Sequence, residues 1–510
     1  MFVNRLKEFR TLRLTAELLK KNERTNIAII GNRRIGKTEL LLEFKEKHHQ
    51  EKTLIFPYLN VQRVGDVDSF VFSYYREFLF ELGRKRKLVA SKITLATWDD
   101  LLILSAKLHL DDITEKLKRE EDMKALAFLF ESQEEILKRT GFLCIFFLDE
   151  FQYVQQFGDR FLEVMRSIVE KQKKSAYVVT GSSISLMETI FSQHREPFFA
   201  QFRRLYLGPL QKQDSIVLAT ALLKKQRMDV DVSTTNELFQ LTHGHPFYIV
   251  SLCRRVIEDF DEVNQEKVRY AFLEETLSPK GDIYLVLDYI FNESLSRAYK
   301  GELHRQILLN LAEHQGWTLS EIARNLKRPS GEVSNYMKVL LKTDLLIRDG
   351  NNYYFRDPLL AFWLKNTYLG IDDTELEKES VRRDLITELT EKYLKVSSEL
   401  GKAKEYEFKI LLEEKFGVQL KRYVSSDGQI EFDLLGENDS VYHIFEVKWR
   451  NKPTGHSDVK KFLTTVKKSK FSGKTVKLYV VSKSDFTIQA KKIAKDNQVI
   501  LLNKKLATVR

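Results

Sequence analysis

The sequence predicts an α/β protein in which a parallel sheet with surrounding helices is followed by a helical lid, a winged-helix domain and a second α/β domain. Apolar, strand-like runs alternate with helix-like segments over about the first 200 residues, which is typical of a parallel sheet. Short helical patterns and a hairpin then occupy residues 300–356, and two further strand-like runs lie within 430–449. Because 510 residues exceed one hydrophobic core, the chain should fold as several domains. We place them at 1–210, 211–290, 291–370 and 385–510.

The first elements frame a glycine-rich loop. Leucines recur at mostly helical spacing over residues 4–20, and the apolar run 27–30 predicts a strand. The complete pattern G-x-x-x-x-G-K-[ST] follows, formed by Gly31, Asn32, Arg33, Arg34, Ile35, Gly36, Lys37 and Thr38. Such a loop turns successive backbone N–H groups toward phosphate oxygens at the start of a helix. We therefore expect ATP here, with Lys37 at the β and γ phosphates and Thr38 on Mg²⁺. A plain glycine turn is the structural alternative.

The following strands bring two carboxylates to the same edge of the sheet. A strand is predicted over 53–59, and fully buried strands over 142–148 and 176–180, with helices between them. Asp149 and Glu150 follow the first buried strand, and ligands gather at the carboxyl ends of parallel strands. Asp149 is expected to hold the Mg²⁺ shell, and Glu150 to orient or deprotonate the attacking water.

Polar residues beyond the next strand leave their roles open. Ser182 is a candidate γ-phosphate sensor, or a residue that shapes a turn. Arg203 and Arg204 are able to supply charge to the phosphoryl transition state, or form a solvated pair beside a strand. Helical patterns then continue to about residue 275.

Three short helical patterns and two strands around Asp349-Gly-Asn-Asn352 predict a winged helix. In its expected recognition helix, the residues placed to enter a DNA groove are Ser334, Asn335, Tyr336 and Lys338. In the wing, Arg348 or Asn351 is placed to contact a phosphate. A structural wing that packs on its neighbours or recruits a partner is the alternative, because this region carries no basic excess.

The C-terminal strands carry a second set of charged residues. Glu446 and Lys448 are two apart on one strand and share a face, and Asp433 stands on the neighbouring strand. Two carboxylates on adjacent strands are able to share Mg²⁺ or Mn²⁺, and a nearby ammonium positions water or stabilises a pentacovalent phosphate. The pattern predicts a metal-dependent phosphodiesterase site, with surface charges on an edge strand as the alternative. Glu405, on a preceding helix, is expected to point toward the sheet.

Charge is concentrated in the same part of the chain. Residues 401–510 hold 23 Lys and Arg against 13 Asp and Glu, which accounts for +10 of the net +11. A polyanion is the expected partner, and nucleic acid, DNA above all, fits best. The two cysteines offer no disulfide framework. No long uncharged apolar stretch and no signal-like N-terminus are seen, so we expect a cytoplasmic protein with no membrane partner.

The motifs together resemble the archaeal ATPase family, a P-loop group related to the AAA+ and STAND ATPases. The resemblance rests on the glycine-rich loop and on Phe2-Val-Asn-Arg5, Leu148-Asp-Glu-Phe-Gln152, Thr180-Gly-Ser-Ser183 and His243-Gly-His-Pro246. It implies Glu150 as the catalytic residue, a helical lid with Gly244 and Pro246 near the nucleotide, and a winged helix behind it. The family often shows Gly-Arg where this chain has Ala200-Gln-Phe-Arg203, which weakens an arginine-finger role for Arg203.

The last 110 residues resemble the PD-(D/E)xK nuclease superfamily. The order of elements matches: a helix with Glu405, a strand with Asp433, a strand with Glu446-x-Lys448, a helix and another strand. The resemblance implies a restriction-endonuclease-like fold with Asp433 and Glu446 as metal ligands and Lys448 as a catalytic residue. Glu405 competes with Glu407 for the upstream position.

These features favour an ATP-hydrolysing, DNA-binding protein with a metal-dependent nuclease domain, in which nucleotide state repositions that domain through the winged helix. The second hypothesis is a STAND-like nucleotide switch whose C-terminal domain binds DNA without cutting it. A transcription regulator that acts through the winged helix is the third. A homo-oligomer is compatible with these hypotheses.

Overall fold

The computed structural model describes residues 3–90, 94–192, 201–297, 301–369, 380–390, 412–413, 415–416, 418–425, 430–438, 441–448, 453–482, 485–503, 506 and 508–509. The chain divides into two compact units, Met1–Thr390 and Glu391–Arg510. Among the described residues, no helix has the length and apolar character needed to cross a bilayer.

A parallel sheet lies at the centre of the first part of unit 1. Its strand order is β2-β4-β5-β1-β6, and β3 also pairs with β4. This confirms the predicted parallel sheet, although the single strand expected over 53–59 is two short strands. The bounds are β1 Asn26–Ile30, β2 Leu54–Ile55, β3 Tyr58–Asn60, β4 Leu143–Asp149, β5 Ser175–Gly181 and β6 Phe202–Tyr206.

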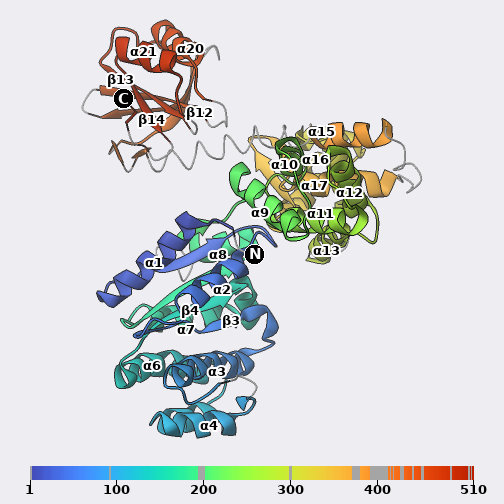
Figure 1. Cartoon of the computed structure of the whole chain (residues 1–510). Helices are drawn as coiled ribbons and strands as arrows, with labels where there is room; N and C mark the ends of the chain where they lie inside the picture. The colour runs from blue at the N-terminus through green and yellow to red at the C-terminus, as the bar shows by residue number, and fades with distance from the viewer. Residues whose placement is uncertain are drawn as a thin grey trace. The chain divides into compact units, whose positions relative to one another are not determined.

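Helices cover both faces of this sheet (Figure 1). Alternate residues of β1 face opposite sides: Ile27 and Ile29 pack with α1 and α2, whereas Ala28 and Ile30 pack with the core beneath α3, α6 and α7. Burial on both faces explains why the central strands read as continuous apolar runs. The helices that bear on this part are α1 Leu6–Lys20, α2 Lys37–Lys47, α7 Asp159–Val169 and α8 Ile184–Ser192.

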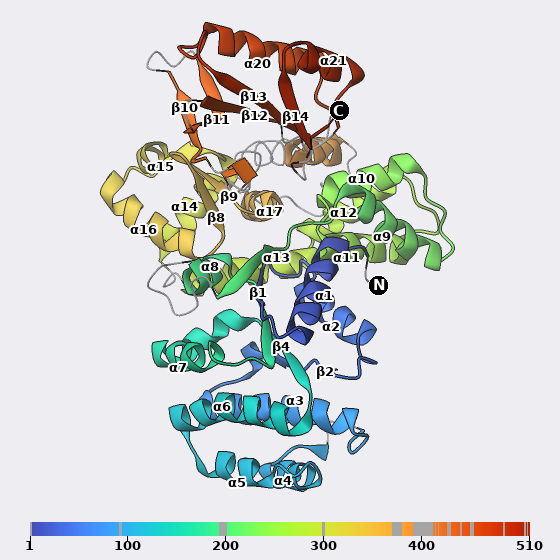
Figure 2. The ribbon, with the colours of Figure 1, turned by 90° about the vertical axis from the view of Figure 1, so that its left-hand side faces the viewer.

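A helical insertion separates β3 from β4. Figure 2 shows α3 and α6 below the sheet and α4 and α5 in a further layer. The helix starts follow local signals: Asp66 caps α3 through the N–H of Ser69, and Thr97 and Asp100 form a capping box on α4. The bounds are α3 Val67–Lys85, α4 Trp98–Lys107, α5 Asp111–Arg119 and α6 Asp122–Thr140.

Five further helices follow in the region for which we predicted a lid, and we call them the lid helices; a group of short elements comes after them. The lid helices are α9 Lys212–Lys225, α10 Val232–Thr242, α11 Pro246–Asp259, α12 Gln265–Leu277 and α13 Asp282–Arg297. What we call the winged-helix region comprises α14 Glu302–Glu313, β7 Trp317–Thr318, α15 Leu319–Asn325, α16 Ser330–Lys342, β8 Leu346–Asp349 and β9 Asn352–Phe355. The three strands pair antiparallel in the order β7-β9-β8, as expected of a winged helix, and α17 Pro358–Leu369 follows.

Unit 2 has a mixed sheet in the order β10-β11-β12-β13-β14. The pairs from β10 to β12 are antiparallel, and those from β12 to β14 are parallel. Val459 and Phe462 of α20 and Ala490 of α21 pack against one face of the sheet, so both helices lie on that face. The bounds are β10 Lys421–Val424, β11 Glu431–Asn438, β12 Val441–Lys448, α20 His456–Lys468, β13 Val476–Ser482, α21 Ile488–Asp496 and β14 Val499–Asn503.

Candidate functional site

The glycine-rich loop joins β1 to α2, as predicted, and both of its glycines are required by the backbone. A Cβ on Gly31 would lie 2.4 Å from the carbonyl oxygen of Leu207, too close for any side chain. Gly36 caps α2 with a φ of +96°, a conformation that only glycine adopts without strain. Ile35 between them is buried, and its carbonyl oxygen accepts a hydrogen bond of 3.1 Å from Arg5. The loop is therefore held in the curled form that presents N–H groups to an anion.

Lys37 begins α2 and is 4% exposed. Its ammonium donates to the carbonyl oxygens of Gly31 at 2.9 Å and Asn32 at 2.8 Å. Burial lowers the pKa of Lys37, and the nearby carboxylates of Glu150 and Asp149 act in the opposite direction. The ammonium of Lys37 is therefore held against the backbone of the glycine-rich loop.

Thr38 and Asp149 meet at the carboxyl edge of the sheet. The Thr38 hydroxyl donates to Asp149 Oδ2 at 2.7 Å, and the Tyr58 hydroxyl donates to the same oxygen at 2.7 Å. Thr180 donates to the other oxygen, Oδ1. Burial, followed by the charge of Asp149, raises the pKa of Tyr58, so this hydroxyl remains a donor at neutral pH. Hydroxyl and carboxylate oxygens are the ligands that Mg²⁺ prefers, so this pair fits that ion, with water and phosphate completing the shell.

Glu150 follows Asp149 at the end of β4 in a left-handed conformation, with a φ of 53°. Its Oε2 accepts hydrogen bonds from Ser182 Oγ at 2.6 Å and from Gln152 Nε2 at 2.5 Å. Gln152 also donates to Ser182 at 3.1 Å. The predicted water-activating carboxylate and the candidate γ-phosphate sensor are therefore in direct contact.

The turn between α10 and α11 brings the lid to this edge. Gly244 has a φ of 77°, and a Cβ on it would lie 2.2 Å from the carbonyl oxygen of Leu210; Pro246 begins α11. His245, between them, stacks on Tyr248 with ring centroids 4.1 Å apart. Burial lowers the pKa of His245 to about 3, so its ring is neutral at physiological pH. The glycine and the proline therefore shape the turn that carries His245.

A cavity of about 80 Å³ lies between the glycine-rich loop, the lid and the winged-helix region, all within unit 1. The loop is fixed to its wall by two side chains: Arg33 pairs with Glu293 of α13, and Arg34 lies over the ring of Phe247 at 4.3 Å. The polar residues that line it are Asn32, Arg33, Arg34, Ser182, Ser183, His245, Glu293, Ser294, Thr343, Asp344, Arg356 and Asp357.

Arg203 and Arg204 lie on the edge strand β6. Their register partners are Ile27 and Ala28 of β1, so both precede the carboxyl edge of the sheet, where Asp149 and Thr38 meet. Both side chains are exposed. This position favours the alternative of a solvated pair over a contact with the nucleotide of the same chain.

The charged residues of unit 2 converge as the alternation predicted. The antiparallel pair Leu434–Phe445 places Asp433 and Glu446 next to one another on β11 and β12. Asp433 Oδ2 accepts from the N–H of Val447 at 2.7 Å, and Lys448 Nζ lies 2.5 Å from Glu446 Oε1. The two carboxylates and the ammonium therefore occupy one end of the β11–β12 hairpin.

The ammonium of Lys448 stays charged there. Burial acts to lower the pKa of Lys448, but the negative charges of Glu446, Asp433 and Asp458 together raise it. Asp458, at the start of α20, also accepts from the N–H of Gly455 at 2.9 Å. A protonated lysine between carboxylates is suited to hold a phosphate oxygen or a water molecule.

The acidic oxygens at this site fit Mg²⁺ or Mn²⁺ only as part of a wider shell. Across the described residues, no three His, Cys, Asp or Glu side chains are grouped to hold a metal ion alone. Glu405, the third predicted carboxylate, lies outside the described residues. Asp433 and Glu446 supply two hard oxygen ligands, and Mg²⁺ commonly keeps several waters or phosphate oxygens besides.

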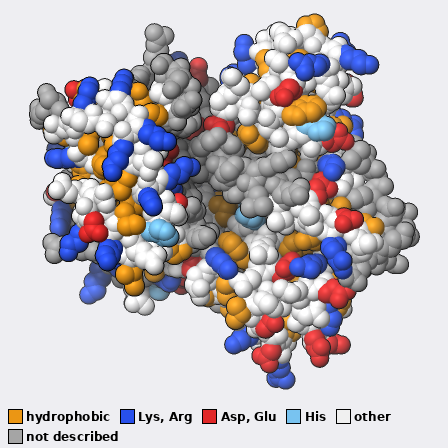
Figure 3. Space-filling view, turned by 90° about the horizontal axis from the view of Figure 1, so that it is seen from above, with side chains coloured by type: hydrophobic (Ala, Val, Ile, Leu, Met, Phe, Trp, Pro, Cys, Tyr) orange, Lys and Arg blue, Asp and Glu red, His pale blue; other side chains and the backbone are white. Residues whose placement is uncertain are grey.

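A basic groove runs along α20. It is lined by Ile430, which stands three residues before Asp433, and by polar side chains of the helix. Among the described residues that line it, none is acidic. Figure 3 looks down on the face formed by α20 and α21, where Lys and Arg side chains gather. The helix residues that line the groove are His456, Ser457, Lys460, Lys461, Thr464, Thr465 and Lys468.

Several residues of the first site were not predicted. Tyr58 contacts the predicted residue Asp149, Asp344 contacts Ser183, and Arg356 lines the cavity. Tyr58 gives a weak signal because it lies within the strand predicted over 53–59, where the pattern assigns it no role. Asp344 and Arg356 give none, since only the packing of the winged-helix region brings them there.

Comparisons with known proteins assign two separate parts of the chain to known families. Residues 2–252 match a family model described as an ATPase domain predominantly from Archaea. Residues 401–507 match a model described as a restriction endonuclease. No curated protein matches the chain.

Among solved structures, a Walker-type ATPase of Pyrococcus abyssi is similar to this chain, with a TM-score of 0.53 at 16% identity. The match covers 72% of this chain and 96% of the Pyrococcus abyssi chain. The Aeropyrum pernix ORC2 protein, in its ADPNP–ADP complexes, has a TM-score of 0.45 at 12% identity, and the match covers 76% of this chain and 95% of the ORC2 chain. The Thermotoga maritima RuvB Holliday junction branch migration motor has a TM-score of 0.36 at 13% identity, over 70% of this chain and 93% of its own. The likeness to the first of these shows a shared fold.

Proposed function

We propose that this chain, which carries an ATPase domain of the archaeal family and a restriction-endonuclease-type domain, hydrolyses ATP, binds DNA and cuts it with Mg²⁺ or Mn²⁺. The observation that carries the nuclease half is the convergence of Asp433, Glu446 and Lys448 at one end of a hairpin. The ATPase half rests on the group formed by Lys37, Thr38, Asp149 and Glu150, described above.

In the hydrolysis step, the N–H groups of the glycine-rich loop and the ammonium of Lys37 hold the phosphates. Thr38 and Asp149 would hold Mg²⁺, which would neutralise charge on the phosphates. Glu150 lies at the end of β4 beside Ser182, so its carboxylate is placed to accept a proton from the attacking water. Tyr58 and Thr180 keep Asp149 in place by occupying both of its oxygens.

In the cleavage step, Asp433 and Glu446 would hold the metal ion, which would supply an activated water and charge stabilisation at the phosphate. Lys448 remains protonated, so it is placed to stabilise the extra negative charge of the phosphate in the transition state. The groove along α20 begins near Asp433, and its described lining carries three lysines, which suits a sugar-phosphate backbone.

The test uses the purified full chain with supercoiled plasmid and single-stranded DNA, with and without ATP, in Mg²⁺, Mn²⁺ or EDTA. We expect metal-dependent nicking or linearisation that is lost in EDTA. The variant Lys448→Ala should lose cleavage and keep DNA binding, measured by fluorescence anisotropy in Ca²⁺. Lys477→Ala, which removes an exposed lysine from β13 of the same sheet, is the matched control and should cut normally.

Each outcome bears on one half of the proposal. DNA binding without cleavage in every metal tested would contradict the nuclease and support a switch whose C-terminal domain binds without cutting. Cleavage that survives Lys448→Ala would place the chemistry elsewhere or expose a contaminating nuclease. ATP hydrolysis is scored separately on the same preparation by phosphate release, with Lys37→Ala as the inactive variant.

A further inference from the structure

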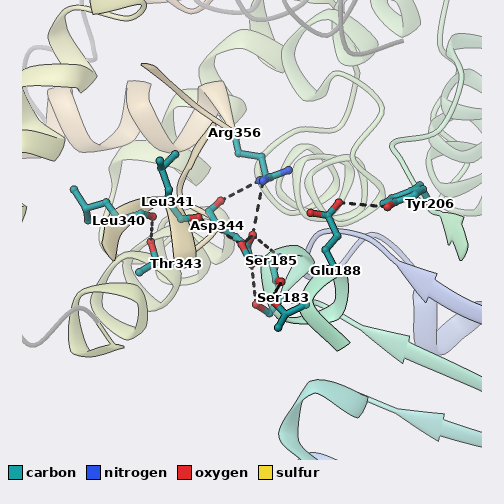
Figure 4. Close-up of polar contacts among 10 residues, drawn as sticks. Ser183, Ser185, Glu188, Tyr206, Leu340, Leu341, Thr343, Asp344 and Arg356 are labelled. Atoms are coloured by element: carbon teal, nitrogen blue, oxygen red, sulfur yellow. Dashed lines mark hydrogen bonds and ion pairs between the residues drawn. The ribbon is translucent and has the colours of Figure 1, made fainter. Parts of the chain in front are cut away.

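A carboxylate of the winged-helix region, that of Asp344, contacts the segment that follows β5. Ser183 Oγ donates to Asp344 Oδ2 at 2.8 Å, and the backbone N–H of Ser185 donates to Oδ1 at 2.9 Å. The hydroxyl of Ser185 donates to the same Oδ1. Figure 4 shows Asp344 reaching from the winged-helix region to these two serines. Three donors from Ser183 and Ser185 therefore converge on the side chain of Asp344 in the winged-helix region.

This contact caps α8. The N–H of Met187 donates to the carbonyl oxygen of Ser183, so Ser183 occupies the residue before the helix. The first N–H groups of a helix lack partners inside the helix, and a carboxylate there satisfies them and complements the helix dipole. In most helices that cap comes from the adjacent sequence. Here Asp344 supplies it from a distant segment of the chain.

Asp344 is itself held rigidly. It follows α16 with a φ of 65°, and its side chain is 14% exposed. Arg356 Nε donates to the carbonyl oxygen of Asp344 at 3.2 Å, and its guanidinium lies 3.7 Å from Oδ1. Arg356 is fixed in turn, because its backbone N–H donates to the carbonyl oxygen of Leu345 at 2.8 Å. The position of the Asp344 carboxylate is thus fixed by the end of α16 and by Arg356, which follows β9.

The serine next to Ser183 belongs to the ATP site. Ser182 donates to Glu150 at 2.6 Å, and Ser182 and Ser183 lie on the segment that leaves β5 at Gly181. Gly181 leaves this segment little room, because a Cβ there would lie 2.3 Å from the sulfur of Met187. One peptide unit therefore separates the residue held by Asp344 from the residue that contacts Glu150.

We infer that Asp344 is a positioning residue for ATP hydrolysis, which acts through Ser183 and Ser185 on Ser182 and Glu150. The winged-helix region then sets the geometry of the γ-phosphate side of the site, so any ligand that moves this region changes the hydrolysis rate. The inference rests on the proposed ATPase activity. It adds a dependence of that activity on a residue that contacts neither Lys37 nor Thr38.

The test is steady-state ATP hydrolysis by the full chain, together with a double-mutant cycle. Asp344→Ala should lower kcat by about tenfold or more, because small misplacements of catalytic groups have large rate effects. The KM for ATP should change less than about threefold, since the groups at the phosphates are untouched. Asp344→Asn, which keeps one acceptor oxygen, should recover part of the rate. The control is Glu332→Gln, at the opposite end of α16, and it should match the parent.

The cycle pairs Asp344→Ala with Ser183→Ala. If Asp344 acts through Ser183, the double variant should be no slower than the slower single variant, whereas independent effects would multiply. Binding of a fluorescent ATP analogue at unchanged stoichiometry separates a rate effect from loss of folded protein. Should Asp344→Ala not fold, Ser183→Ala and Ser185→Ala test the same contact from the other side.

A kcat within twofold of the parent, a kcat that rises, or multiplicative losses in the cycle would overturn the inference. Absence of hydrolysis in the parent chain would instead refute the proposed ATPase activity, and the two failures are therefore distinguishable.

Discussion

Arg33 of the glycine-rich loop and Glu293 of α13 form a bidentate ion pair. Arg33 Nη1 lies 2.5 Å from Glu293 Oε2, and Nη2 donates to Oε1 at 2.7 Å. The guanidinium also lies over the ring of Tyr289 at 5.3 Å. Both charged groups are largely buried, with 24% and 19% of their side chains exposed. The lid is therefore fastened to the loop that would hold the phosphates, and the negative charge of Glu293 offsets a positive charge beside them.

Replacing Glu293 tests this balance. Glu293→Gln keeps the shape and removes the negative charge, so Arg33 attracts a polyanion more strongly. We expect ATP to bind about threefold to tenfold more tightly, which corresponds to about 1 kcal/mol for one charge at such a distance and effective dielectric. The measurement is titration with a fluorescent ATP analogue. Glu302→Gln, at the start of α14, serves as control, and unchanged or weaker binding in Glu293→Gln would refute the electrostatic argument.

The role of Glu150 makes a separate prediction. Glu150→Gln keeps a hydrogen-bond acceptor for Ser182 but cannot take a proton from water. We expect kcat for ATP hydrolysis to fall by about a hundredfold to ten-thousandfold with KM almost unchanged. Phosphate release measures it, and Glu163→Gln on the exposed face of α7 is the control. A loss smaller than about tenfold would mean that another group activates the water.

The edge-strand arginines are expected to be silent in the isolated chain. Because β6 places Arg203 and Arg204 beside Ile27 and Ala28, before the carboxyl edge of the sheet, we expect neither to contact the nucleotide of its own chain. The double variant Arg203→Ala and Arg204→Ala should therefore keep the parental kcat at protein concentrations where the chain is monomeric by light scattering. A large loss under those conditions would show that the arginines act within one chain.

The local parts of both sites could be predicted, because neighbouring residues in sequence define them. Gly31 to Thr38 follow a strand directly, and Glu446 and Lys448 share a strand face by alternation alone. Asp433 required one further assumption, that its strand pairs with the next, and β11 and β12 do pair. The same reasoning predicted the parallel sheet from the fully buried runs that became β4 and β5.

The remaining contacts could not be predicted, because they join segments that sequence patterns treat separately. Glu293 meets Arg33 only because α13 packs beside the glycine-rich loop, and Asp344 meets Ser183 only because α16 ends against α8. Neither acid stands in a motif. The break between β2 and β3 was also missed, although Pro57 stands between them and lacks the N–H that a continuous strand would use.

Stability should depend on pH through His245. Burial lowers the pKa of this histidine to about 3 in the folded protein, whereas an unfolded chain has a value near 6.5. The unfolded state therefore binds more protons as the pH falls below about 6.5, and the stabilising contribution of the neutral ring is lost between about pH 6.5 and 3. Since the ring is partly accessible, we expect a loss of about 1 kcal/mol at pH 5.

The measurement is urea unfolding of unit 1 within the full chain, followed by circular dichroism at pH 7 and pH 5. His245→Asn should unfold with a smaller pH dependence than the parent, and His109→Asn, an exposed histidine after α4, should behave as the parent does. Equal pH dependence in all three proteins would show that the buried ring does not control stability in this range.

The groove along α20 predicts how DNA binding responds to salt. Each phosphate contact made by a lysine adds about 0.9 to the slope of log affinity against log salt concentration. If Lys460, Lys461 and Lys468 contact phosphates, their joint replacement by Ala should reduce that slope by about 2 to 3 and weaken binding at low salt. Fluorescence anisotropy with a labelled duplex in Ca²⁺ measures both quantities without cleavage.

The matched control removes three lysines from the neighbouring helix, with Lys491, Lys492 and Lys495 of α21 replaced by Ala. Both variants lower the net charge of the same domain equally, so a general electrostatic effect would change both slopes alike. A groove that holds the backbone beside Asp433 requires the α20 variant to lose more slope and also more cleavage rate. Equal losses would show that the basic face attracts DNA diffusely, and that α20 does not guide the strand to the metal-binding carboxylates.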